Sequence, residues 1–193
     1  MQPIYFTLKR VKKQRQDRLD CCKLLGDPVM HLDDPNTEQQ LNIDGYFLAQ
    51  ISFEELPLHP YGLEKGWLHI FIDPDSLQCH ATYSEKEPNI IVDDINEGSL
   101  EAGLGDPNAL EMVFEGEEGN YLLGDIDPNI GAESEVGIEG KVCLMMLDAY
   151  ALPDNVLNFL SIRSGDGYLL ILIDEEDLKK RDFSHIEARE IIS

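Results

Sequence analysis

The side chains with the clearest capacity for metal chemistry are scattered along the chain and form no recognisable motif. The five histidines are His31, His59, His69, His80 and His185. No two of them are four residues apart, and none lies beside a Cys-x-x-Cys pair. Cys79 and His80 are neighbours in a predicted strand, so their side chains point to opposite faces and do not share a metal easily. We therefore predict no metal site and no cofactor.

The motifs that would indicate catalysis or nucleotide binding are incomplete. Residues 125–136 resemble a calcium loop, but Ile130 and Val136 stand where the loop needs Gly and Glu. The Gly103-Leu104-Gly105 segment lacks the third glycine of a dinucleotide site, and the chain has no Gly-x-Ser-x-Gly elbow. A catalytic triad assembled in space would leave no mark in the sequence. Whether the protein is an enzyme is therefore left open.

Four polar or aromatic residues are candidates for a ligand site: Gln50, Trp67, Asp148 and Asp166. If the chain folds as two similar halves, these residues could line the cleft between them, where duplicated folds often bind ligands. The alternative is that they only stabilise the fold. Trp67 lies in a predicted core strand, and Asp166 lies in a Gly-Asp-Gly turn that favours Asp for local hydrogen bonding.

The net charge is the most unusual property of the chain. The sequence holds 38 acidic and 15 basic side chains, a formal net charge of −23, and residues 87–139 contain no Lys or Arg. Such a surface repels nucleic acid and anionic lipid and attracts basic proteins; it can also serve solubility alone. We predict a partner-binding acidic surface that includes Glu87, Asp93, Asp94, Glu97, Glu115, Glu117 and Glu118.

The basic residues concentrate near the N-terminus, where residues 9–18 hold six Lys or Arg. This segment could bind a partner, but we favour a solvated helix face or an arm that folds back on the acidic surface. The four cysteines form no disulfide framework, and no secretory signal or apolar run of membrane-spanning length is present. We expect a cytoplasmic protein with no membrane contact. The sequence does not indicate an oligomeric state.

Two similar strands organise the rest of the chain. Residues 66–77 and 167–178 both read as a glycine, an aromatic residue, an apolar strand and an acidic end. Two further pairs of segments match: 24–27 with 122–125, and 46–51 with 142–147. The offset is 98 residues for the first of these pairs, 96 for the second, and 101 for the glycine-led strands. Nearly constant offsets indicate an internal repeat whose units pack together.

We therefore predict an α+β fold with mainly antiparallel pairing, built as a tandem duplication of two similar β-rich subdomains with pseudo-two-fold symmetry. The predicted first unit covers residues 24–92 and the second covers 121–193. Residues 93–120 form the predicted connection. The whole chain, 1–193, is then one domain.

The motifs Phe47-Leu48-Ala49-Gln50-Ile51, the Gly-aromatic-Leu strand at Gly66 and Gly167, and the closing segment 165–184 resemble the YwqG-like family. This is a group of bacterial proteins classed as a domain of unknown function (DUF1963). The family's second half tends to carry Gln-Ile-Asp where this chain has Met146-Leu147-Asp148. The resemblance implies a duplicated fold in a bacterial cytoplasmic protein. Some members are encoded beside secreted-toxin systems, which implies an immunity or inhibitor role.

Two functional hypotheses follow from these observations. The first is a non-catalytic protein that binds a basic, toxin-like protein partner through its acidic surface, without nucleic acid or membrane. The second is a small-ligand binding protein or enzyme that uses the cleft between the two repeat halves.

Overall fold

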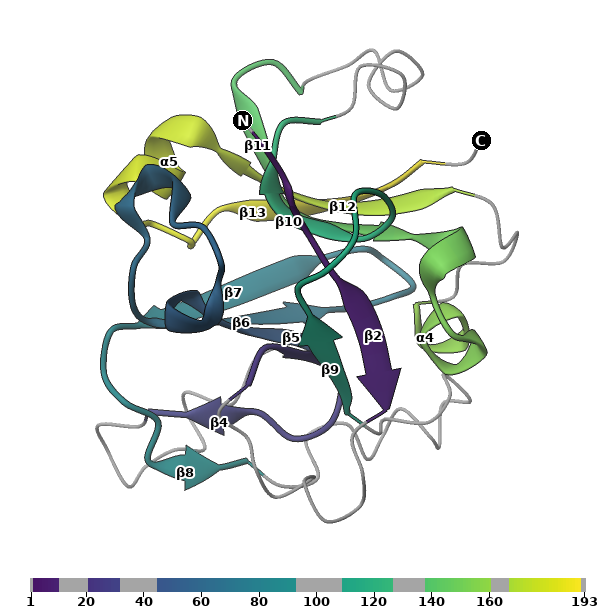
Figure 1. The fold of residues 1–193 in the computed structure, drawn as a ribbon, viewed down its shortest axis with the longest axis horizontal. Coiled ribbons are helices and arrows are strands. Elements are labelled where there is room, and N and C mark those ends of the chain that lie inside the picture. Colours follow the sequence, from purple (N-terminus) through teal and green to yellow (C-terminus); the bar gives the residue numbers. More distant parts are fainter. Residues whose placement is uncertain are drawn as a thin grey trace.

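The computed structural model describes residues 2–10, 21–31, 45–92, 109–126, 138–160 and 167–191 of the chain. Within these residues the protein consists mainly of antiparallel strands in three sheets, with a few short helices (Figure 1). The prediction of mainly antiparallel β pairing is confirmed. No helix in this part of the chain is long and apolar enough to cross a membrane.

The largest sheet has six strands. In spatial order they are β2 (Thr7–Arg10), β9 (Leu110–Val113), β3 (Lys23–Leu24), β5 (Tyr46–Ser52), β6 (Trp67–Ile72) and β7 (Cys79–Ser84). Every residue of β6 is buried. A strand that is covered on both faces is expected to read as a continuous apolar run, as most of Trp67–Ile72 does.

The second sheet has five strands. In spatial order they are β1 (Ile4–Tyr5), β10 (Tyr121–Gly124), β11 (Lys141–Asp148), β12 (Tyr168–Asp174) and β13 (Ile186–Ile191). The N-terminal segment joins the two sheets, because β1 pairs with β10 while β2 pairs with β9. Between them, the backbone N–H of Phe6 donates to the carbonyl of Asn120 at 3.0 Å.

The two sheets enclose the main hydrophobic core. One face of β6 contributes Leu68, Ile70 and Ile72, and one face of β12 contributes Leu169 and Ile171. The opposite, outer face of the five-stranded sheet carries a separate apolar cluster that includes Leu170 and Leu172. Side chains that alternate along a strand therefore divide between an inner and an outer face in both sheets.

The third sheet pairs β4 (Val29–Met30) with β8 (Ile90–Ile91). In Figure 1 it lies below the six-stranded sheet, on the side away from the five-stranded sheet. Met30 and Val92 pack there with Phe47 and Phe71 in a small cluster. This small sheet therefore belongs to the outer face of the six-stranded sheet.

Short helical turns follow several strands. They are η2 (Phe53–Glu55) after β5, η3 (Pro60–Gly62), η4 (Ala149–Ala151) after β11, α4 (Asp154–Phe159) and α5 (Glu175–Lys180) after β12. Glutamates in the first turn of α5 and lysines in its last turn complement the helix dipole.

The segment between η2 and β6 contacts the end of α5. Arg181 donates to the carbonyl of Gly62 at 3.2 Å and pairs with Glu85, and Phe183 stacks on Phe53 with ring centroids 6.2 Å apart. These contacts join residues that are 96 to 130 positions apart in the chain.

Candidate functional site

The outer face of the six-stranded sheet carries a row of polar side chains on four neighbouring strands. Lys23 lies directly opposite Gln50, Gln50 opposite His69, and His69 opposite Thr82. Residues that are directly opposite in a sheet place their side chains on the same face. We call Lys23, Gln50, His69 and Thr82 the polar row. Glu111 lies opposite Lys23 on its other side and extends the row toward β2.

Three members of the row are almost completely buried: Lys23, Gln50 and His69. Their inner-face neighbours Leu24, Ala49 and Ile70 belong to the main core. Burial of a polar group destabilises a protein unless the group is hydrogen-bonded. The partners of these three side chains therefore decide whether the row is available for chemistry.

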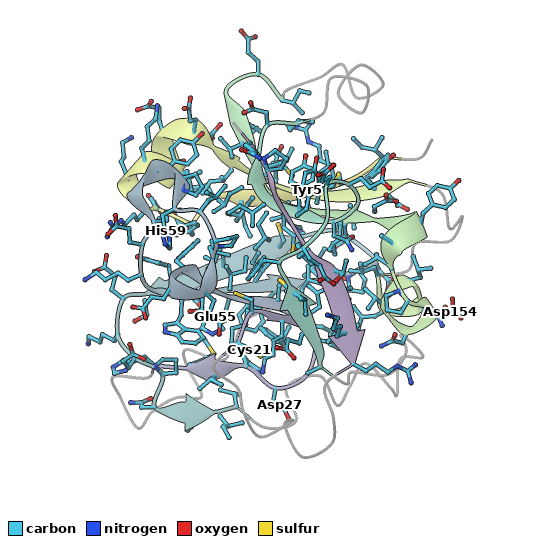
Figure 2. All side chains as sticks on the ribbon, viewed as in Figure 1. Tyr5, Cys21, Asp27, Glu55, His59 and Asp154 are labelled. Atoms are coloured by element: carbon cyan, nitrogen blue, oxygen red, sulfur yellow. The ribbon has the colours of Figure 1, made fainter. Side chains whose placement is uncertain are left out.

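All three side chains bind the backbone of residues 21–29. Gln50 accepts from the N–H of Val29 at 2.8 Å and donates to the carbonyl of Cys21 at 3.0 Å. His69 Nε2 lies 2.7 Å from the carbonyl oxygen of Val29, and Lys23 Nζ donates to the carbonyl of Asp27. Figure 2 shows Cys21 and Asp27 in the lower part of the molecule, close to β4. The row thus anchors the segment that leads from β3 to β4.

The contact of His69 fixes its tautomer. A carbonyl oxygen only accepts hydrogen bonds, so Nε2 carries the proton and donates it. Burial, with a further contribution from the positive charge of Lys23, lowers the pKa of His69 from 6.5 to about 4. The ring is therefore neutral at physiological pH and is not positioned as a proton donor to solvent.

Lys23 carries the only buried ammonium group among the described residues. Burial lowers its pKa from 10.5 to about 8, although Cys21 and Asp27 partly oppose this shift. An amine with such a pKa can act as a base or nucleophile once it is accessible. Here its exposed fraction is 1%, and Asp27 accepts one of its hydrogen bonds. A structural role explains these contacts.

Thr82 differs from the other three. Its Oγ1 is buried and has no hydrogen-bond partner among the described residues, although the residue as a whole is half-buried. A hydroxyl group left in this way destabilises the fold by about 1–3 kcal/mol. Thr82 is therefore the one position in the row where the structure leaves a polar group unsatisfied.

Two of the four predicted ligand-site residues lie on the same face. On β6, Trp67 is two residues before His69, so both side chains lie on the same face. Trp67 lies opposite Ser52, which is two residues after Gln50 on β5. Both Trp67 and Gln50 are buried. Phe47 and Phe71 lie farther along this face and are covered by Met30 and Val92. Gln50 and Trp67 are thus brought close together, but on a covered surface.

Asp148, the third predicted ligand-site residue, lies in the five-stranded sheet. It faces Tyr168 at the end of β11, and Tyr168 packs with the cluster on the outer face of the five-stranded sheet. Its side chain accepts from the N–H of Tyr150 at 2.9 Å, and its own N–H donates to the side chain of Asn120 at 2.9 Å. It therefore begins the turn η4. Asp166 lies outside the described residues. The structure does not bring Asp148 together with Gln50 and Trp67.

The predicted acidic surface is described in part. Glu115, Glu117 and Glu118 lie in the connection between β9 and β10, and all three are exposed, as is Glu87 before β8. Asp93, Asp94 and Glu97 lie outside the described residues. Glu115 pairs with Lys9 at 3.4 Å and accepts from the hydroxyl of Thr7. The first residue of the basic segment 9–18 therefore contacts the protein's own acidic surface.

The cysteines and acidic residues of the described regions form no group of three or more metal ligands. All four cysteines are free thiols. Burial raises the pKa of Cys79 and of Cys143 to about 12 and raises that of Cys22 well above its usual value. Because the thiolate is the nucleophile, these three thiols are poorly reactive at neutral pH.

Gln50 is recognisable in the sequence as a candidate, but its partners in the row are not. Lys23 lies in a two-residue strand and His69 in an apolar run, and the register that aligns them involves strands far apart in the chain. The only sequence signal is that each polar residue is flanked by apolar residues, so that a strand would bury it. Asn120, which is buried and binds the N–H of Asp148, was missed for the same reason.

Comparison of the chain with protein-family models finds no match. Comparison with curated proteins finds no similar sequence. The resemblance to the YwqG-like family therefore rests on the short motifs quoted above.

Proposed function

We propose that the protein is a non-catalytic binding protein that presents an acidic surface to a basic protein partner. One contrast carries this proposal. The buried polar side chains best suited to chemistry, Lys23, Gln50 and His69, bind the protein's own backbone. Glu117 and Glu118, by comparison, are exposed and make no ion pair within the described residues.

The connection between β9 and β10, residues 114–120, is the best described part of this surface. We call it the acidic loop. Its only described ion pair is that of Glu115 with Lys9, in which both side chains are more than half exposed. Exposed pairs of this kind contribute about 0–1 kcal/mol and are screened by salt. A basic partner can therefore compete with Lys9 at little energetic cost.

The rest of the surface charge supports the same proposal. With a formal net charge of −23, the protein steers cationic proteins toward itself and repels anions over roughly a Debye length, about 8–10 Å at physiological salt. The resemblance to the YwqG-like family supports a bacterial cytoplasmic immunity or inhibitor protein with a toxin-like partner. The four free thiols fit a reducing compartment.

We also propose that the chain is a tandem duplication within a YwqG-like domain, with units at 24–92 and 121–193. The strand order β3-β5-β6-β7 in one sheet parallels β10-β11-β12-β13 in the other. Each second strand has an irregularity, between Phe47 and Ala49 in β5 and between Cys143 and Met145 in β11. These positions are 96 residues apart, and a 3-10 turn follows each of the two strands.

Backbone conformation adds independent support for the duplication. Leu25 and Leu123 both have positive φ, 58° and 51°, a conformation that bulky residues rarely adopt. Both precede a Gly-Asp pair, and they are 98 residues apart. The polar row has no counterpart in the second unit, since the matching positions hold Tyr121, Met146 and Leu170.

The alternative, a ligand site or enzyme in the cleft between the two halves, receives less support. Gln50 and Trp67 lie on the outer face of one sheet, and Asp148 lies on the outer face of the other. The main core separates these two faces. One ligand of ordinary size does not contact both.

Affinity capture with two matched variants tests the proposed function. Immobilised wild-type protein should retain a basic protein from its host, and the retained protein should be released by added salt because exposed charges are screened. Replacement of Glu115, Glu117 and Glu118 by Gln should slow association. Replacement of the exposed Glu54, Glu64 and Glu190 by Gln changes the net charge equally and should have a smaller effect. Salt-insensitive capture, equal effects of the two triple variants, or no captured partner would contradict the proposal.

A further inference from the structure

The edge strand β8 exposes two adjacent isoleucines. Ile90 is 42% exposed and Ile91 is 39% exposed. The other exposed large apolar side chains of the described regions, Leu58 and Tyr150, lie apart from each other in different loops. Within the described residues β8 pairs only with β4, so its other edge has no neighbouring strand. An open strand edge with apolar side chains is a template for pairing with another chain.

The register shows which backbone groups face this open edge. Val29 lies opposite Ile91, and the N–H of Val92 donates to the carbonyl of Pro28 at 3.0 Å. Hydrogen-bonded and non-hydrogen-bonded pairs alternate along an antiparallel ladder, so the pair Val29–Ile91 is non-hydrogen-bonded. The backbone groups of Val29 agree with this assignment, because they bind Gln50 and His69. The N–H and C=O of Ile91 therefore point away from β4.

The β4–β8 sheet is also held in place. Gln50 and His69 attach Val29 to the six-stranded sheet, and Met30 and Val92 pack on Phe47 and Phe71. A partner strand would thus meet an edge that is already ordered. Binding to a preorganised edge avoids much of the entropy loss of association.

The charges around β8 select a basic occupant. Glu87 is exposed just before the strand, and Asp93 and Asp94 follow it directly in the sequence. Lys86 is the single Lys or Arg between positions 66 and 140. An acidic or neutral strand, including β8 of a second copy of this chain, lacks this charge complementarity. A segment with alternating apolar and basic side chains has it.

We propose that β8 is a docking edge for an extended, basic segment of a partner protein, which adds as a strand beside β8 and packs the apolar side chains of its one face on Ile91. This inference rests on the proposed function and specifies the form of the partner segment. Main-chain hydrogen bonds to Ile91 supply affinity, and the exposed Glu87 together with the net charge of −23 favours Lys or Arg in the added strand.

Two labelled peptides of equal charge test the proposal by fluorescence anisotropy. One alternates valine and lysine over eight residues, and the other alternates glycine and lysine. Wild-type protein should bind the valine peptide roughly tenfold more tightly, because only this peptide forms a strand with an apolar face. Ile91→Lys should weaken its binding roughly tenfold, whereas Tyr150→Lys, with the same charge change at another exposed apolar site, should change it less than about twofold.

Ile91→Pro adds a test of the backbone contact, since proline removes the outward N–H while the groups that pair with β4 remain. This variant should also weaken binding of the valine peptide. If this variant does not fold, as judged by circular dichroism, the proposal is tested by the comparison of Ile91→Lys with Tyr150→Lys alone.

Equal binding of the two peptides, no binding of either, or equal effects of Ile91→Lys and Tyr150→Lys would overturn the docking edge. The proposed binding of a basic partner through the acidic surface is tested separately, by the two triple glutamate variants described above. A dimer in sedimentation experiments that is lost in Ile91→Lys would assign the edge to a second copy of the chain and also overturn the proposal.

Discussion

Gln50 and His69 face each other on adjacent strands, and together they hold both backbone polar groups of Val29. Gln50 accepts from the N–H at 2.8 Å, and His69 lies 2.7 Å from the carbonyl oxygen. In a sheet, a neighbouring strand would satisfy these groups. Here the buried side chains of Gln50 and His69 supply these hydrogen bonds in place of a strand. Strand β4 therefore lies on the outer face of the six-stranded sheet without being one of its strands. The interaction explains why polar residues are buried at this place.

Removal of the Gln50 amide should destabilise the protein strongly. Gln50→Leu leaves the N–H of Val29 and the carbonyl of Cys21 without their partner. An unsatisfied buried group costs about 1–3 kcal/mol, and because these two groups are only part-buried the free energy of unfolding should fall by about 2–4 kcal/mol. Urea unfolding measures this change. Gln78→Leu, at an exposed glutamine, is the matched control and should stay within about 0.5 kcal/mol of wild type. Similar losses in the two variants would contradict the anchoring role of Gln50.

His69 should make the stability depend on pH in the acidic range. Its pKa is about 4 in the folded protein and about 6.5 when unfolded, so below pH 6.5 the unfolded state binds the proton more readily. The contribution of neutral His69 is therefore complete above pH 6.5 and is lost as the pH falls toward 4. Between pH 7.5 and pH 5 it should decrease by about 2 kcal/mol.

The measurement compares wild type with His69→Gln by urea unfolding at pH 7.5 and pH 5. Protonation of the many carboxylates acts on both proteins alike, so the difference between them isolates the histidine. The free energy of unfolding of the variant should fall less on acidification. An equal fall in both proteins would show that His69 titrates normally.

Lys23 should make the free energy of unfolding depend on pH in the alkaline range. Its pKa is about 8 when folded and about 10.4 when unfolded, so between these values the unfolded state binds more protons and the stability rises with pH. From pH 7 to pH 9.5 this group alone should add about 2 kcal/mol to the free energy of unfolding. Lys23→Met should lack this increment relative to wild type in guanidinium unfolding at the two pH values. A variant with an unchanged pH profile would mean that the Lys23 ammonium is solvated.

Much of the sheet structure could be predicted from the sequence, because most strands combine apolar periodicity with clear turn residues. Strands β5 and β11 lie within about two residues of the matching segments 46–51 and 142–147, and β6 and β12 lie inside the glycine-led segments 66–77 and 167–178. The apolar and β-branched run 4–8 is typical of one continuous strand, but in the structure it is divided at Phe6 between two sheets. That division depends on where β9 and β10 pair, which local patterns do not encode.

The site was less predictable than the fold. Gln50 could be singled out as a polar residue in an apolar strand, but its partners are backbone groups of Cys21 and Val29, 29 and 21 residues away in the chain. Side chain–backbone contacts of this kind leave no residue-type signal at the backbone partner. The separation of Asp148 from Gln50 likewise follows from which faces pack together in the core.

Gly66, the glycine that opens the β6 motif, should tolerate a methyl group less well than Gly62 does. Both have positive φ, 103° and 68°, so alanine strains the backbone at each position. A Cβ at Gly66 would also lie 2.7 Å from the ring of Tyr83, whereas nothing lies within 4 Å of a Cβ at Gly62. Tyr83 packs with Phe53 and Phe183 and cannot move freely. Gly66→Ala should therefore be less stable than Gly62→Ala by about 1–3 kcal/mol in urea unfolding. Equal stabilities would mean that the ring shifts without loss of stability, and that only the positive φ of the backbone requires glycine here.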